Sequence, residues 1–391
     1  MSSQPLPHTV SPALCASGAF TLLAIACLTI MVGCVIVPGL TEIAARLGVG
    51  QAAGWLVTVP SLGVVLLGPL AGWCIARLGN YRALGWGLFA YGLLGAGGVL
   101  LEGAPLIFAD RFLLGGATAV VMAAGTGLLS HFYHGPARLA MMARQGMAIE
   151  LGGVIFLFIG GLLATLGWRW PFALYLVAWL LLVMLRLWVP RPPEATPVAA
   201  GHGGNARLWA VHGAALCSMI SFFTGVITLP AHLHHLGLAP AQIGSFLAFV
   251  SLVAVGAAWL MPRTATRLGE HGALALAFVA YAAAHALFAL AYAAAHALFA
   301  LAGTLPLFIA GGVLMGLGFG LSVPLANHLV VERSPAATRG TQLARLSMAI
   351  FSGQFLASFM AFMPTQGGGA FWLAALLALA AAAILPWRIR G

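Results

Sequence analysis

Long runs of apolar residues, separated by short polar segments, extend along nearly the whole chain. A membrane-spanning helix needs about 20 apolar residues, and runs of that size recur from one end of the sequence to the other. They predict helices over residues 13–39, 51–76, 83–101, 104–131, 145–167, 171–189, 208–230, 241–262, 272–302, 305–331, 341–363 and 369–387. The pattern therefore predicts an all-α polytopic membrane protein with twelve transmembrane helices.

One long polar interruption divides the chain into two halves. It reads PRPPEATPVAAGHGGNAR at residues 190–207, after the sixth predicted helix, and its Pro and Gly content is typical of a flexible linker. We therefore expect an N-terminal six-helix bundle at 1–189, a cytoplasmic linker at 190–207 and a C-terminal six-helix bundle at 208–391. A short repeat supports two pseudo-symmetric bundles, because Arg-Leu-Gly at 77–79 recurs at 267–269, half the chain further on. Parallel repeats of this kind are typical of transporters with a site near the bilayer midplane.

Composition and charge placement agree with a membrane location. Hydrophobic residues make up 62% of the chain and charged residues only 6%, against about 25% charged in a soluble domain. The net charge of +10 would suit a nucleic-acid-binding protein only if the Arg residues formed one basic face. Instead they lie in short loops, which excludes nucleic acid as an expected partner.

The Arg distribution also predicts the orientation, since basic loops stay in the cytoplasm. With both termini cytoplasmic, the inner loops and tail hold most of the Arg residues, namely Arg77, Arg82, Arg138, Arg144, Arg186, Arg191, Arg207, Arg263, Arg267, Arg333, Arg339, Arg345, Arg388 and Arg390. Only Arg46 and Arg169 fall outside, and Arg111 falls within a helix. The absence of Lys and the abundance of Ala, Gly, Leu and Arg are typical of a GC-rich bacterial gene, so we expect a bacterial inner (cytoplasmic) membrane protein.

Three ionisable residues lie inside predicted membrane helices: Asp110, Arg111 and Glu150. Charge in the hydrocarbon is costly, so each is a candidate for function, and we assign them to proton coupling. Asp110 and Arg111 point about 100° apart on a helix and need not pair. The alternative is that both reach the outer interface and anchor their helix. Glu150, in apolar surroundings, suits reversible proton carriage, and its alternative is an interface-facing acid near a helix start.

Several motifs resemble those of the major facilitator superfamily. Gly72, Arg77 and Gly79 match the family's loop signature Gly-x-x-x-Asp-Arg-x-Gly-Arg, whereas Ala76 and Asn80 depart from it, and Arg82 lies two residues further on. The stretch RFLLGG at 111–116 resembles the family's Arg-x-x-Gln-Gly element. The resemblance covers essentially the whole chain and implies the major facilitator fold. It also implies a gating loop on the cytoplasmic side at Gly72, Arg77, Gly79, Arg82, Arg267 and Gly269. Because Ala76 replaces the acid, the resemblance implies a latch that is weakened or rebuilt.

Further residues resemble drug exporters of the superfamily. GWRWPF at 167–172 is typical of their outer turn, and Gly152, Gly160 and Gly161 match part of the exporters' helix 5 motif. We therefore expect a secondary transporter that couples proton entry to efflux of a small, partly apolar organic molecule, either a drug or a siderophore, and siderophore exporters of the alcaligin type are similar in build. The alternatives are a proton-coupled importer of a nutrient or iron chelate and, in another class, a membrane-embedded enzyme or receptor. No catalytic cluster supports an enzyme.

In the resembling family, helices 1, 4, 7 and 10 line the substrate cavity. With a neighbour on helix 11, this implies the substrate-cavity candidates Arg111, Met122, Ser218, Ser221, Thr224, Ser322, Asn327 and Gln354. Ser and Thr in membrane helices often bond their own backbone, so we expect only some of these to touch substrate. The segment AHLHHLG lacks a nearby acid or Cys, and we expect no metal and no cofactor. We expect a monomer.

An eleven-residue phrase, AYAAAHALFAL, occurs twice in succession at 280–290 and 291–301. Eleven residues at about 100° each return to nearly the same helical face. A helix over 272–302 would be about 46 Å long, against a hydrocarbon core of about 30 Å. A thirteenth crossing would place the next Arg residues outside, so we expect a tolerated duplication that lengthens helix 9 at the outer face. A paired-His sensor is the alternative.

Overall fold

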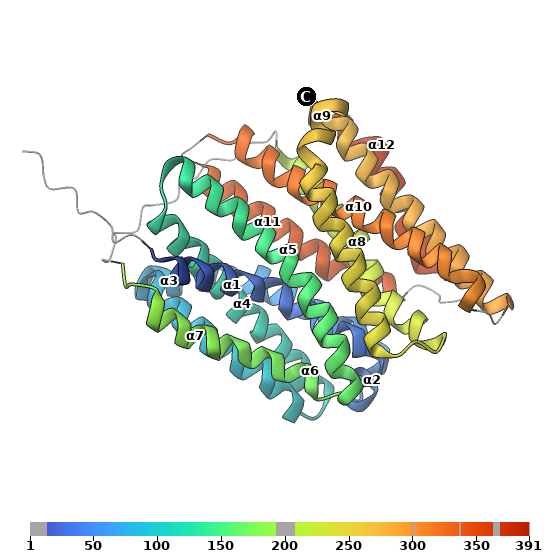
Figure 1. Ribbon diagram of the computed structural model, residues 1–391, viewed down its shortest axis with the longest axis horizontal. Helices are drawn as coiled ribbons and strands as arrows, with labels where there is room; N and C mark the ends of the chain where they lie inside the picture. The colour runs from blue at the N-terminus through green and yellow to red at the C-terminus, as the bar shows by residue number, and fades with distance from the viewer. Residues whose placement is uncertain (1–13, 193–207, 299–300, 336–337, 363–367, 391) are drawn as a thin grey trace, which may run out of the picture.

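The computed structural model describes residues 14–192, 208–298, 301–335, 338–362 and 368–390, and every regular element in these ranges is helical (Figure 1). The N-terminal half contains α1 (Ala16–Cys34), η1 (Val37–Gly39), α2 (Leu40–Arg46), η2 (Gly50–Ala52), α3 (Ala53–Gly97), η3 (Gly98–Leu100), α4 (Ala104–Phe132), α5 (Gly135–Leu166), α6 (Trp170–Ala173), η4 (Leu174–Leu176) and α7 (Val177–Trp188). The C-terminal half contains α8 (Trp209–His235), α9 (Pro240–Leu298), α10 (Leu301–Arg333), α11 (Arg339–Leu356), η6 (Ala357–Phe362) and α12 (Gly369–Arg390). The predicted linker lies mostly outside the described residues.

Two of these helices cross the membrane twice. The described residues contain 10 helices long and apolar enough to span a bilayer. However, α3 has 45 residues and α9 has 59, about 68 and 89 Å at 1.5 Å per residue, at least twice the thickness of the hydrocarbon core. Each bends back at one glycine, Gly79 (φ 73°, ψ 159°) or Gly269 (φ 72°, ψ 163°). Two bends added to ten helices give the twelve crossings predicted, so the predicted fold class is confirmed.

The two bends show why the Arg-Leu-Gly motif is repeated. At both glycines φ is positive, a backbone conformation that residues with a Cβ rarely adopt. A bend at this point lets the polypeptide reverse with almost no loop, which explains why helical structure continues on both sides. The motif therefore marks the same structural position in each half. Figure 1 places the bend end of α9 beside the C-terminus.

Equivalent hydrogen bonds in the two halves differ in residue number by the same amount as the two bends. The step in numbering from Gly79 to Gly269 is here called the repeat offset. The Tyr91 hydroxyl donates to the Leu28 carbonyl at 2.7 Å, and the Tyr281 hydroxyl lies 3.0 Å from Ser218 Oγ. The repeat offset relates Tyr91 to Tyr281 and also relates Leu28 to Ser218. In both halves, a tyrosine of the third crossing thus bonds to the first crossing.

Beyond the duplicated phrase, the two halves correspond at a larger spacing. Gly115 packs on the Pro60 carbonyl, and a Cβ on Gly316 would lie 2.6 Å from the Val250 carbonyl. The repeat offset relates Pro60 to Val250, but Gly316 lies eleven positions beyond the equivalent of Gly115. The C-terminal half therefore holds eleven extra residues before Gly316, the length of one copy of the phrase. Two turn glycines with positive φ show the same larger spacing, namely Gly167 and Gly368.

The extra residues lengthen the ninth crossing. Helix α9 continues at least as far as Leu298, eleven positions beyond the equivalent of Gly97, where α3 ends. The earlier parts of the two helices match at the repeat offset. The ninth crossing is therefore three turns longer than its counterpart, about 16 Å. The last described residue of α9, Leu298, and the first residue of α10, Leu301, both belong to the second copy. The first-copy residue His285 is fully buried, whereas the side chain of His296 lies outside the described part.

Candidate functional site

The two halves meet along seams at the end of the bundle opposite the chain termini, here called the distal end. Near the start of α3, the Thr58 hydroxyl hydrogen-bonds to Ser358 Oγ of η6. In the second seam, a Cβ added to Gly161 of α5 would lie 2.8 Å from the Pro240 carbonyl, and one added to Gly244 of α9 would lie 2.6 Å from the Leu157 carbonyl. The backbones of α5 and α9 therefore touch, and close contact at the distal end depends on these glycines.

The predicted cavity residue Gln354 lies on the same boundary. A Cβ on Gly33 of α1 would lie 2.9 Å from Gln354 Nε2 of α11. Nearby, Phe351 packs with Val64 and Ala119 of the N-terminal half, and the half-buried Met122 packs against this small apolar cluster. Gln354 and Met122 thus lie where the halves face each other.

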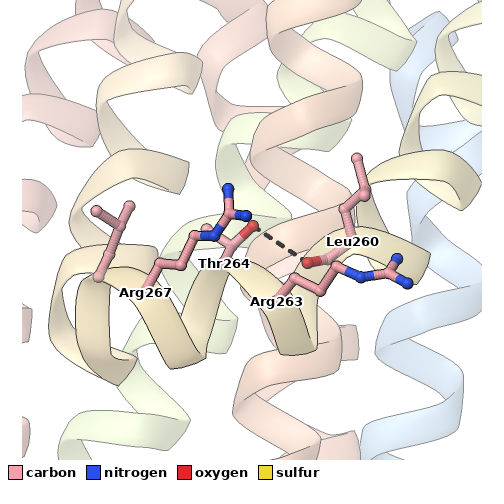
Figure 2. A pocket seen from close by; sticks show the side chains of 5 residues that line it. Leu260, Arg263, Thr264 and Arg267 are labelled. Atoms are coloured by element: carbon pink, nitrogen blue, oxygen red, sulfur yellow. Dashed lines mark hydrogen bonds between the residues drawn. The ribbon is translucent and has the colours of Figure 1, made fainter.

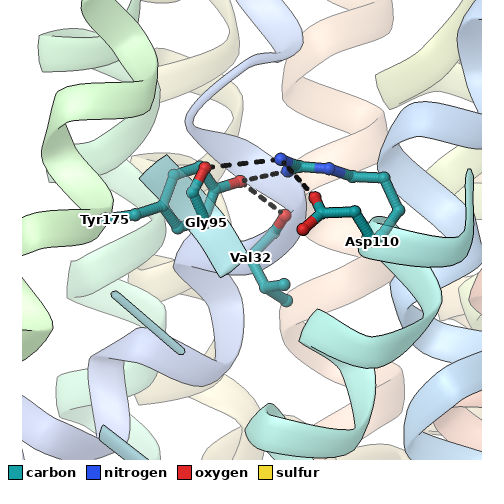
Figure 3. Close-up of polar contacts among 5 residues, drawn as sticks. Val32, Gly95, Asp110 and Tyr175 are labelled. Atoms are coloured by element: carbon teal, nitrogen blue, oxygen red, sulfur yellow. Dashed lines mark hydrogen bonds and ion pairs between the residues drawn. The ribbon is translucent and has the colours of Figure 1, made fainter. Parts of the chain in front are cut away.

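The structure places Arg111 inside the N-terminal half, where it is 1% exposed (Figure 3). Its Nη2 lies 3.3 Å from Asp110 Oδ2 and donates to the Gly95 carbonyl at 3.4 Å. Its Nη1 donates to the Tyr175 hydroxyl at 3.4 Å, and that hydroxyl donates to the Val32 carbonyl at 3.1 Å. The guanidinium therefore connects α4 to α3, η4 and, through Tyr175, α1.

These contacts bear on the alternative in which the pair anchors its helix at the outer interface. Asp110 and Arg111 do pair although they are neighbours on a helix, and both are buried within the half instead of extending to the interface. Glycines on α3 and η3 provide the space: a Cβ on Gly98 would overlap the guanidinium of Arg111, and one on Gly95 would overlap the Tyr175 ring. The stretch Gly-Ala-Gly-Gly at 95–98 was the sequence signal for this pocket, and sequence reasoning passed over it.

In the C-terminal half, the predicted cavity residues Ser218 and Ser322 bond to each other. Their Oγ atoms are 2.6 Å apart, and Ser218 Oγ also contacts the Tyr281 hydroxyl at 3.0 Å. All three are at most 1% exposed. His285, one turn beyond Tyr281, donates from Nε2 to the Ser221 carbonyl at 2.9 Å. This polar cluster joins α8, α9 and α10, and its tyrosine and histidine were not among the predicted site residues.

Two further cavity candidates bond to their own helices. Thr224 Oγ1 donates to the Ile220 carbonyl at 2.7 Å. Asn327 Nδ2 donates to the Val323 carbonyl at 3.1 Å while its side chain remains exposed. These bonds follow the general tendency of polar residues in membrane helices to satisfy themselves locally.

Glu150 is the intramembrane acid without a fixed cation. It is half-buried on α5 and forms no ion pair within the part of the chain that the structure describes. It lies two turns before Leu157 on the same face of α5, and the Leu157 carbonyl would lie 2.6 Å from a Cβ on Gly244 of α9. Because α5 and α9 belong to different halves, Glu150 lies at the boundary between them.

The predicted gating loops differ between the halves. Arg77 stacks over Trp73 with 4.3 Å between the guanidinium carbon and the ring centre. A Cβ on Gly72 would meet no atom of another element within 4 Å in the described part of the chain. At the equivalent bend, Glu270 pairs with Arg333 at 2.7 Å, and Arg333 also donates to the Ile389 carbonyl at 2.8 Å. The C-terminal bend is therefore tied to α10 and α12 by an acid that directly follows the repeated motif.

Glu270 also lies near His328 and Glu332, and the ligand atoms of the three are within 4.8 Å of one another. Such a group can hold a cation in principle. Arg333 already compensates Glu270, and the His328–Glu332 pair at 3.2 Å is exposed, so the arrangement is that of a solvated charge network.

Family comparison agrees with this architecture. The model of the Major Facilitator Superfamily matches residues 19–299, and the model described as sugar (and other) transporter matches residues 211–388. The chain belongs to the Major Facilitator Superfamily. It is a multi-pass membrane protein and a secondary transporter of this superfamily, which is a transporter family and not an enzyme family. Among curated protein sequences, none matches this chain.

Solved structures share the fold over almost the entire chain. A D-xylose–proton symporter has a TM-score of 0.74 at 17% identity and covers 94% of this chain and 96% of its own. A POT family transporter in complex with 5-aminolevulinic acid has a TM-score of 0.75 at 12% identity, with coverages of 94% and 95%. The inward open xylose transporter from E. coli has a TM-score of 0.70 at 16% identity, with coverages of 94% and 95%. At these identities the likeness shows the fold alone.

Proposed function

We propose that this protein exports a small, partly apolar organic molecule, such as a drug or a siderophore, in exchange for protons. It would act as a monomer in a bacterial inner membrane, with both termini in the cytoplasm and the distal end facing outward. The observation that carries the proposal is the position of Glu150, a half-buried acid that forms no ion pair among the described residues and lies on the face of α5 that contacts α9 of the other half.

The two intramembrane acids differ in their freedom to exchange protons. Asp110 lies 3.3 Å from Arg111 inside the N-terminal half, so its nearest cation belongs to the same half and moves with it. Glu150 has no such partner among the described residues, and it lies on the same face of α5 as Leu157 and Gly161, which contact α9 of the opposite half. Rocking of the halves therefore changes the environment of Glu150 more than that of Asp110. This is the property that coupling requires, since proton binding must differ between the two states.

The direction of transport is proposed from helix 5. Gly160 packs on the Val35 carbonyl directly after α1, and Gly161 packs on α9, so two of the glycines that resemble the exporter motif lie where α5 contacts each half. The alternative, a proton-coupled importer, is favoured by the similarity to a D-xylose–proton symporter. That similarity rests on 17% identity, and we therefore rank import second.

Transport in inside-out vesicles with an imposed proton gradient tests the proposal, with fluorescent drugs and hydroxamate siderophores as substrates. We expect gradient-driven accumulation of at least one compound. In the Glu150→Gln variant, this accumulation should fall to that of empty vesicles, while exchange of labelled for unlabelled substrate continues because binding and rocking remain. Glu102→Gln, at an exposed acid, is the control and should transport normally.

Three results would count against the proposal. Normal gradient dependence in Glu150→Gln would remove Glu150 from coupling. Uptake only in right-side-out vesicles would establish import. A chemically changed product would indicate an enzyme.

A further inference from the structure

A basic surface depression lies on α9 just before the Gly269 bend (Figure 2). It is lined by Leu260, Arg263, Thr264, Arg267 and Leu268. Arg263 and Arg267 are one helical turn apart and both exposed, and residues at this spacing are neighbours on a helix surface. The depression thus presents two guanidinium groups at the end of a membrane-spanning segment.

The two positive charges are not compensated by acids of the protein. No acid lines the depression, and neither Arg263 nor Arg267 forms an ion pair within the described ranges. The nearest acid in sequence, Glu270, is engaged by Arg333 at 2.7 Å. The Thr264 hydroxyl donates to the Leu260 carbonyl at 3.1 Å, which leaves its oxygen lone pairs and the two guanidinium groups as the polar lining. The site therefore favours an anion.

The surroundings of the two arginines are apolar. Trp259 is 67% exposed, Leu260 43% and Leu268 54%, and the Arg263 guanidinium lies over the Trp259 ring at 4.6 Å. Tryptophan is enriched at the headgroup level of membranes, and cytoplasmic arginines bind anionic headgroups. A ligand that fits must therefore offer a phosphate next to hydrocarbon, which a free anion does not.

The equivalent position in the N-terminal half lacks one of the two charges. The repeat offset relates Arg267 to Arg77 and relates Arg263 to Trp73, so a tryptophan replaces the first arginine. Arg77 stacks on that ring at 4.3 Å. Both halves thus carry an interfacial Trp–Arg pair, but only the C-terminal bend adds a second arginine one turn away.

We propose that this depression binds the phosphate of an anionic phospholipid between Arg263 and Arg267. The acyl chains then lie along Trp259, Leu260 and Leu268. Guanidinium groups suit this ligand because their planar donors match phosphate oxygens in pairs. The bound lipid sits at the predicted cytoplasmic face, beside the bend that ties α9 to α10 and α12.

Lipid binding to the purified full-length protein tests the site, measured by native mass spectrometry during titration with dioleoyl phosphatidylglycerol. We expect binding of phosphatidylglycerol in preference to phosphatidylcholine. Each basic residue near an anionic headgroup contributes a factor of about five in affinity, so the Arg263→Gln/Arg267→Gln variant should bind about 30-fold more weakly. The double variant Arg138→Gln/Arg144→Gln, which removes two exposed arginines elsewhere, should match the wild type.

A second variant and a competitor keep the test decisive. Arg263→Lys/Arg267→Lys retains the charge and should keep most of the binding, which separates loss of the site from loss of the fold. Excess inorganic phosphate should not displace the lipid. Unchanged affinity in the Arg-to-Gln variant would overturn the proposal, and so would displacement by inorganic phosphate, because the site would then take a soluble anion.

Discussion

Arg111 shows how one charged side chain can organise half of a membrane protein. It is among the largest fully buried side chains, and its guanidinium contacts an acid, a tyrosine and a backbone carbonyl. A buried charge is tolerated when it is paired and hydrogen-bonded. The Arg111 network thus has the character of a structural connection within the N-terminal half, and the predicted roles of Arg111 in substrate binding and proton coupling stay predictions.

We expect Arg111→Met to lower the free energy of unfolding by about 3–5 kcal/mol, because Asp110 is then left buried without its cation. Adding Asp110→Asn removes that uncompensated charge, so the double variant should be more stable than Arg111→Met alone. Thermal unfolding in detergent measures the stability of each variant. Arg169→Met, at an exposed arginine, is the control. A double variant as unstable as the single one would show that the ion pair is not the source of the loss.

The sequence was a partial guide to individual residues. The sequence predicts that Asp110 and Arg111 lie inside a membrane helix, because they interrupt an apolar run. Their pairing is not, since it depends on Gly98 of a different element leaving space for the guanidinium. Likewise, Ser218 and Ser322 were identifiable as intramembrane polar residues, but their bond to each other depends on the rotation of α8 and α10 about their axes. That rotation is set by packing and not by local sequence.

At the scale of elements, hydropathy located the membrane-embedded part of each helix better than its ends. The fourth helix was predicted at 104–131 and spans Ala104–Phe132. The fifth was predicted to start at residue 145 but α5 starts at Gly135, because Pro136 suits the first turn and the following polar turns extend beyond the apolar core. Hydropathy also suggested loops between the second and third crossings, where helical geometry in fact continues to a single bend at Gly79.

The contact of α5 with α9 predicts a conformational effect for one methyl group. A Cβ on Gly244 would lie 2.6 Å from the Leu157 carbonyl and 2.9 Å from Gly161 Cα, and backbone atoms cannot move aside as a flexible side chain can. Gly244→Ala should therefore separate the halves at the distal end and shift the population toward states open there.

Accessibility of a cysteine at Ser358 reports this shift, once the native cysteines have been replaced. Ser358 is fully buried, so we expect a membrane-impermeant maleimide to label Ser358→Cys several-fold faster when Gly244→Ala is present. Gly256→Ala on the same helix is the matched control, since nothing lies within 4 Å of its Cβ. Equal labelling in all three backgrounds would mean that the α5–α9 contact does not hold the distal end closed.

At the scale of the whole molecule, the internal repeat explains the duplicated phrase. The halves correspond at the repeat offset before the phrase and eleven positions further on after it, which places the additional residues in the C-terminal half. The sequence revealed the duplication and its helical phase. It did not reveal how the two copies divide their roles, because identical residues differ here only in what surrounds them. His285 of the first copy is buried beside Ser221, whereas Tyr292 of the second copy stacks on His232 at 4.2 Å.

Deleting one copy should therefore yield a folded, active transporter. Removal of 280–290 or of 291–301 gives the same chain, in which the remaining copy supplies the core tyrosine and histidine and the two halves match at the repeat offset throughout. We expect normal expression, a monodisperse elution profile and transport close to that of the wild type. Deletion of the equivalent residues 90–100 is the control and should abolish folding, because it removes Tyr91 and the glycines beside Arg111 without a second copy to replace them. If deletion of one phrase also abolishes transport, the lengthened ninth crossing is required for function, and the paired-His alternative gains support.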